Sequence, residues 1–232
     1  RMGKLTNLLF GSIGTMVETS DLQRQAFNEA FAENGLGWDW DTKTYLELLK
    51  KSGGRQRIEN YADAQGIAVD ATALHARKTE IFDQKLQQEN ITLRPGALEV
   101  VRTAKSNGVT LGFVTSTSAQ NSDALFAALK GQLSRDDFAF IGNAMMVENS
   151  KPAPDIYEVA IKALRIDPKT CLAIEDTPVS LAAATAAGLD CIAFPGAYAD
   201  VEAFRSGVVI ERNALSFETL LDHMSKDNPP TV

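Results

Sequence analysis

The sequence predicts an α/β protein in which a helical insertion interrupts a parallel sheet directly after its first strand. From residue 94 onward, short apolar runs alternate with helical patterns, as in repeated β-α units. Between residues 17 and 93 the patterns are helical, and no run is typical of a strand. We therefore expect one core domain made of residues 1–16 and 94–232, and a separate helical domain made of residues 17–93.

Five short apolar runs are the expected strands of the core. They cover residues 5–10, 109–114, 138–141, 171–174 and 191–194. Helical spacing of apolar residues predicts the connecting helices, at 97–106, 119–130, 154–164 and 179–187. Strands joined through helices lie parallel, and both faces of such a sheet are covered.

The insertion contains four expected helices. They cover residues 21–34, 44–51, 55–65 and 71–88. Gly35 and Gly66 end two of these helices, since glycine readily adopts the left-handed conformation of a helix terminus. At the other end of the chain, the polar residues 226–232 are expected to be disordered.

Composition and charge limit the classes of partner. The 232 residues include 23 Lys and Arg against 30 Asp and Glu, a net charge of −7, which disfavours nucleic-acid and anionic-membrane binding. No apolar run approaches the roughly 18 residues of a membrane span, and the first residues lack the apolar stretch of a secretion signal. Cys171 and Cys191 are too few for a disulfide framework. We expect a cytoplasmic protein and leave its protein partners open.

Chemically useful residues follow several of the expected strands. They are the glycine-rich residues 11–15, the hydroxyl-rich residues 115–118, Lys151, and the adjacent Glu175 and Asp176. Ligands of open parallel sheets bind beyond the carboxyl ends of the strands. Each segment alone fits an ordinary turn or helix start, but together they favour a site for phosphate and a divalent cation.

These segments resemble the motifs of the haloacid dehalogenase (HAD) superfamily, and most closely its CbbY-like and β-phosphoglucomutase-like sugar-phosphate phosphatases. The resemblance implies a HAD-like, Rossmann-like core with a helical C1 cap as the insertion. It implies that Thr115 and Lys151 bind a phosphoryl group, and that Glu175 and Asp176 hold Mg²⁺. The further residues it assigns are phosphate contacts, at Ser12, Ser116 and Asn121, and substrate-facing cap residues, at Glu18, Gly54, Arg55 and Arg57.

The first motif departs from the family pattern Phe-Asp-x-Asp-Gly-Thr. Here the sequence is Phe-Gly-Ser-Ile-Gly-Thr, with Gly11 in place of the nucleophile and Ile13 in place of the general acid/base. Removing a catalytic nucleophile costs on the order of 10⁶ in rate. The backbone carbonyl of Ile13 is retained as a metal ligand, but a carboxylate ligand is lost. The resemblance therefore implies weakened Mg²⁺ binding and impaired aspartyl-phosphate chemistry.

Three functions are compatible with these residues. The first is a non-hydrolysing protein that binds phosphate or a small phosphorylated metabolite. The second is a Mg²⁺-dependent phosphatase of such metabolites with weak or altered activity. The third is a structural or interaction protein that uses only the fold, because a fold by itself does not establish a function.

Overall fold

The computed structural model describes residues 4–51, 53–88 and 90–226. The chain forms two compact units. The core unit contains the chain up to Glu18 and again from Thr92, and the cap unit is Thr19–Ile91. Of the tail expected to be disordered, residues 227–232 lie outside the described residues.

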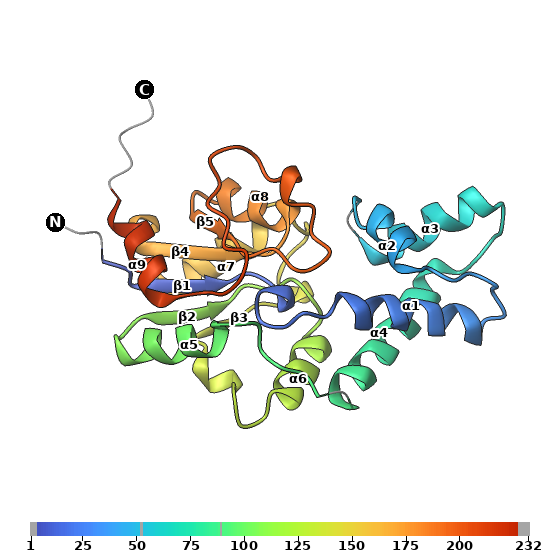
Figure 1. Cartoon of the computed structure of the whole chain (residues 1–232), viewed down its shortest axis with the longest axis horizontal. Coiled ribbons are helices and arrows are strands. Elements are labelled where there is room, and N and C mark those ends of the chain that lie inside the picture. Colours follow the sequence, from blue (N-terminus) through green and yellow to red (C-terminus); the bar gives the residue numbers. More distant parts are fainter. Residues whose placement is uncertain (1–3, 52, 89, 227–232) are drawn as a thin grey trace. The chain divides into compact units, whose positions relative to one another are not determined.

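The core unit contains a parallel five-stranded sheet with the strand order β3-β2-β1-β4-β5 (Figure 1). The strands are β1 (Asn7–Phe10), β2 (Thr110–Phe113), β3 (Phe140–Ile141), β4 (Cys171–Glu175) and β5 (Asp190–Ala193). All residues of β1 and β4 are buried, as expected for central strands covered on both faces. The parallel sheet that the sequence predicts is confirmed.

Helices connect the strands of the core. They are α5 (Ala97–Ser106), α6 (Ala119–Ala128), α7 (Asp155–Leu164) and α8 (Pro178–Ala186). Residues of α7 and α8, including Tyr157 and Ala183, share one apolar cluster with Leu9 and Ala173 of the central strands. A further helix, α9 (Phe217–Ser225), contacts α5 and is absent from the sequence-based expectations. The Ser216 side chain caps it by accepting a hydrogen bond from the Thr219 N–H.

The cap unit contains four helices around an aromatic centre. They are α1 (Ser20–Glu33), α2 (Thr42–Leu48), α3 (Gly54–Gln65) and α4 (Ala71–Gln88). Trp40 is fully buried, and its ring centroid lies 4.7 Å from that of Phe31 and 4.9 Å from that of Phe27. Such aromatic pairs add to the burial of apolar area, so the cap unit has a hydrophobic core of its own.

The helices do not resemble membrane spans. Within the described part of the chain, none combines the length and the apolar character that crossing a bilayer requires.

Candidate functional site

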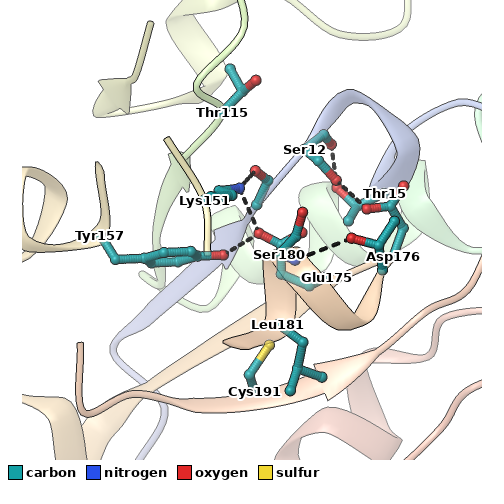
Figure 2. A network of polar contacts seen from close by, with 12 residues as sticks. Ser12, Thr15, Thr115, Lys151, Tyr157, Glu175, Asp176, Ser180, Leu181 and Cys191 are labelled. Carbon is teal, nitrogen blue, oxygen red and sulfur yellow. Dashed lines mark hydrogen bonds and ion pairs between the residues drawn. The ribbon is translucent and has the colours of Figure 1, made fainter. Parts of the chain in front are cut away.

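The ends of three adjacent strands bring the sequence-predicted residues of the core together. β1 lies between β2 and β4, so Gly11 and Thr115, which follow β1 and β2, share one edge of the sheet with Glu175, the last residue of β4. The Gly11 N–H donates to the carbonyl of Ile174 at 2.9 Å, which continues the ladder past the end of β1. Figure 2 shows Lys151 approaching the same place from the segment before α7.

Glu175 fills the space beside Gly11. A Cβ placed on Gly11 would lie 1.7 Å from Glu175 Oε1 and 2.3 Å from the Tyr157 hydroxyl oxygen. That carboxylate oxygen accepts hydrogen bonds from Lys151 Nζ at 2.7 Å and from the Tyr157 hydroxyl at 2.5 Å. Lys151 also donates to the Gly11 carbonyl. The glycine is therefore part of a packed arrangement, because no residue with a side chain fits there while Glu175 keeps this position.

The proton between Tyr157 and Glu175 belongs to the phenol. Burial, together with the charge of Glu175, holds the pKa of Tyr157 well above its usual range. Glu175 is completely buried, and its second oxygen, Oε2, has no hydrogen-bond partner among the described residues. Leaving such an atom unsatisfied costs about 1–3 kcal/mol or more for a charged group. A ligand that donates a hydrogen bond to Oε2 would remove this cost.

The turn after β1 binds the second carboxylate. The Ser12 hydroxyl donates to Asp176 Oδ1 at 2.8 Å, and a Cβ on Gly14 would lie 1.9 Å from Asp176 Oδ2. Burial, and then the neighbouring Glu175 charge, raise the pKa of Asp176 to about 6. Ile13 begins the short 3₁₀ turn Ile13–Thr15, and its side chain is buried. An isoleucine here adds an apolar contact and no proton-transfer group.

The hydroxyl-rich segment contributes one buried group and one helix cap. Thr115 is buried, and its Oγ1 accepts a hydrogen bond from the Thr117 N–H at 3.1 Å. Ser116 is half-buried beside it. Asn121 lies in the first turn of α6, where its backbone N–H donates to Ser118 and its amide donates to Thr117 at 2.7 Å. These contacts make Asn121 a support of the segment.

The two carboxylates at this edge accept hydrogen bonds from neighbouring side chains of the core. Mg²⁺ takes six oxygen ligands in near-octahedral geometry and usually keeps several waters beside one or two carboxylates. The described residues contain no group of three or more Asp, Glu, His or Cys side chains placed to hold a metal. Glu175 Oε1 already accepts two hydrogen bonds, and Asp176 Oδ1 accepts one. Glu175 Oε2 is a buried oxygen without a hydrogen-bond partner among the described residues.

Glu18 and Arg94 organise the two chain segments that enter and leave the insertion. The Glu18 carboxylate accepts a hydrogen bond from the Ala197 N–H at 2.8 Å, within the core unit. The Arg94 guanidinium lies 3.4 Å from the centroid of the Phe194 ring and donates to the carbonyls of Gly14, Phe194 and Pro195, each at 2.7 Å. The family resemblance implies a substrate-facing role for Glu18. In the structure, the hydrogen bond from Ala197 to Glu18 holds a loop of the core.

The cap residues assigned by resemblance have structural contacts of their own. Arg55 pairs with Glu59 at 2.6 Å on the exposed side of α3. Arg57 donates to the carbonyls of Leu48 and Lys51 and lies 5.9 Å from the ring centroid of Phe27.

Two residues of α4, His75 and Lys78, are more enclosed than their polar surroundings in the sequence predict. A Cβ on Gly54 would lie 2.6 Å from His75 Nε2, and burial lowers the pKa of His75 to about 4. Lys78 is buried, donates to Gln23 and lies 4.6 Å from the Phe27 centroid. Both lie in the polar sequence His-Ala-Arg-Lys, which is typical of a solvated helix face.

The Gly11→Ala variant is expected to lower the free energy of unfolding by about 1–3 kcal/mol, because the added methyl overlaps the Glu175 carboxylate. Thermal or urea unfolding followed by far-UV circular dichroism measures this loss. Gly37→Ala is the matched control, since a Cβ there meets nothing within 4 Å. Wild-type stability of the Gly11 variant would contradict the packing of Glu175 against residue 11.

Comparisons with known proteins agree with this architecture. Residues 9–188 match the model of the haloacid dehalogenase-like hydrolases. Protein CbbY of Cereibacter sphaeroides is 40% identical over 200 residues, which span 85% of this chain and 87% of that protein. CbbY from Rhodobacter sphaeroides in complex with phosphate is 39% identical with a TM-score of 0.80, over 89% of this chain and 92% of that one.

A second structure extends the comparison. A mutant of CbbY from Rhodobacter sphaeroides in complex with xylulose-(1,5)bisphosphate has a TM-score of 0.81 at 38% identity, over 89% of this chain and 93% of that one. The model match covers most of the chain, and the described core has the parallel sheet of these structures. The chain belongs to the haloacid dehalogenase-like hydrolase family.

Proposed function

We propose that this chain binds a small phosphorylated metabolite at the carboxyl ends of β1, β2 and β4 without hydrolysing it through an aspartyl-phosphate. The single observation that carries the proposal is that Gly11 stands where the haloacid dehalogenase family has its nucleophile. Glu175 Oε1 lies within 1.7 Å of the position that a Cβ would take there. A two-step displacement requires an attacking side chain, and residue 11 has none.

The binding part of the proposal rests on the groups that are present. Lys151 and Thr115 supply an ammonium and a buried hydroxyl at one edge of the sheet. Ser12, Ser116 and Asn121 are the further phosphate contacts that the resemblance implies. Solved structures of CbbY contain phosphate and xylulose-(1,5)bisphosphate. By analogy, we infer a sugar phosphate or a similar metabolite as the ligand class.

The cap residues enter the proposal as determinants of the ligand. Gly54, Arg55 and Arg57 would select among phosphorylated metabolites, and Glu18 would support the loop at Ala197. The net charge of −7 disfavours nucleic acid and anionic membranes as partners, whereas the local charge of Lys151 can still hold a small anion. We place this function in the cytoplasm, in line with the composition.

Mg²⁺ is at most a weak ligand in this proposal. In the resembling family a carboxylate at position 11 contributes to the metal site, and glycine contributes no donor atom. Glu175, Asp176 and the Ile13 carbonyl are what remains of the predicted metal ligands. Fewer oxygen ligands mean weaker binding of a cation that gives up its water reluctantly.

Membership of a hydrolase family favours one alternative, a phosphatase with weak activity. The decisive measurement is a panel of phosphate esters assayed with Mg²⁺, paired with thermal unfolding in the presence of sugar phosphates. We expect no turnover above that of a Lys151→Met variant, and a rise in Tm that grows with ligand concentration. Turnover that Lys151→Met abolishes would establish the phosphatase. If the chain shows no turnover and no rise in Tm, only a structural role remains.

A further inference from the structure

The buried, unpartnered oxygen of Glu175 and the placement of Lys151 together point to the chemical form of the ligand. We propose that this site binds a phosphate group that carries a proton, without a divalent cation, and that Glu175 Oε2 accepts the hydrogen bond from the P–OH group. The inference rests on the proposed function and adds which phosphate species is bound and what accompanies it.

The charges of the site balance without a divalent cation. The site contains one ammonium, Lys151, and two acidic side chains, Glu175 and Asp176, and the charge of the Arg94 guanidinium also acts on Asp176. The two aspartates of the family pattern would add two negative charges, which is the charge that a divalent cation neutralises. Gly11 and Ile13 add none, so the site reaches the same balance without a metal ion.

Lys151 keeps one N–H group for a ligand. An ammonium has three N–H groups in tetrahedral arrangement. Two of them are engaged, one by the Gly11 carbonyl and one by Glu175 Oε1. The third N–H and the hydroxyl of Thr115 can donate to phosphate oxygens at this edge. The Lys151 ammonium therefore supplies the positive charge that faces the phosphate.

The buried acceptor Glu175 Oε2 selects for a ligand that carries a proton. Glu175 is completely buried, Oε1 accepts two hydrogen bonds, and Oε2 accepts none among the described residues (Figure 2). A carboxylate oxygen attracts a ligand O–H but repels an anion that has only lone pairs to present. Hydrogen phosphate has the required proton, whereas sulfate, of similar size and charge, does not.

Calorimetric titration of the full chain with inorganic phosphate and with sulfate, at pH 7, tests the inference. In EDTA we expect phosphate to bind at least tenfold more tightly than sulfate, and 5 mM Mg²⁺ to change the phosphate Kd by less than twofold. Lys151→Met should lose phosphate binding, which ties the signal to this site. Phosphate binding that requires Mg²⁺, or equal affinity for sulfate, would overturn the inference while the proposed function stands.

The Glu175→Gln variant supplies the matched test of the acceptor. Its amide has nearly the same shape but offers N–H donors, so the preference for phosphate over sulfate should fall to about twofold or less. A preference that stays tenfold in a variant with a wild-type circular dichroism spectrum would overturn the role of Glu175. If this variant does not fold, the phosphate-to-sulfate ratio of the wild-type chain still decides. Absence of phosphate and sugar-phosphate binding under every condition would overturn the proposed function as well.

Discussion

The Gly11→Asp/Ile13→Asp variant is expected to hydrolyse phosphate esters in the presence of Mg²⁺ at least about 10³-fold faster than the wild-type chain. A nucleophile and a general acid/base are worth on the order of 10⁶ and 10²–10⁴ in rate, respectively, when each is well placed. The expected gain is smaller because the new Asp side chain overlaps Glu175 Oε1, which must first turn away. Lys151 can then pair with the introduced carboxylate.

Two controls separate chemistry from packing. Gly11→Asn/Ile13→Asp places a side chain of the same shape at position 11 but supplies no carboxylate, and it should stay at the wild-type rate. Gly11→Asp alone should give little turnover, because Ile13 cannot protonate the leaving group. A wild-type chain that already turns over as fast as the double variant would refute the proposal that Gly11 and Ile13 prevent hydrolysis through an aspartyl-phosphate. Thermal unfolding of each variant shows whether the changes are accommodated.

The Lys78→Met variant is expected to stabilise the cap unit near pH 6.5 by about 1–3 kcal/mol. Burial, and then the charge of Arg57, lower the pKa of Lys78 from 10.5 to about 7. Holding this ammonium charged in the folded chain costs on the order of 4 kcal/mol. Methionine has no such cost, but it loses the cation–π contacts with Phe27 and Phe82 and leaves Gln23 without its donor.

The difference in the free energy of unfolding between Lys78→Met and the wild-type chain is expected to fall as the pH rises. Folding lowers the pKa of Lys78, so the unfolded chain binds more protons between pH 7 and 10.5. Wild-type stability therefore rises with pH across this window, and the advantage of Lys78→Met should vanish or reverse by about pH 10. Both tryptophans, Trp38 and Trp40, lie in the cap unit, so fluorescence during urea unfolding reports on it.

Lys43→Met is the control for this experiment, because Lys43 is an exposed residue of α2. Its difference from the wild-type chain should stay within about 0.5 kcal/mol at every pH. An advantage of Lys78→Met that does not change between pH 6.5 and 10 would mean that the ammonium of Lys78 is not held in a desolvated position.

The sequence predicts the sheet and its functional edge because both depend on local patterns. Apolar runs alternating with helical spacing define the parallel strands, and the rule for strand ends then selects Thr115, Lys151 and Glu175. In the fold, Thr115 follows β2, Lys151 comes after β3, and Glu175 is the last residue of β4. The departure at Gly11 is visible in the sequence only through resemblance to a motif, since a glycine after a strand is otherwise an ordinary turn residue.

The remaining features depend on contacts between distant residues. Glu175 turns toward residue 11 because no side chain occupies that space and because Tyr157 and Lys151 hold the carboxylate there. Lys78 belongs to a polar stretch of sequence and is buried by Phe27 and Phe82. The sequence pattern around Glu175 or around Lys78 does not reveal these neighbours, because they are distant in the sequence.

The bridge between Val17 and Leu93 makes the insertion a self-contained module. These residues pair antiparallel, and the Arg94 N–H donates to the Met16 carbonyl at 2.7 Å. The chain therefore departs from the core and returns to it at a single joint, and every strand pairing of the sheet is made without the intervening residues. A different insertion needs only to match this joint, so an exchange of modules offers evolution, or an engineer, a route to a new ligand preference on an unaltered sheet.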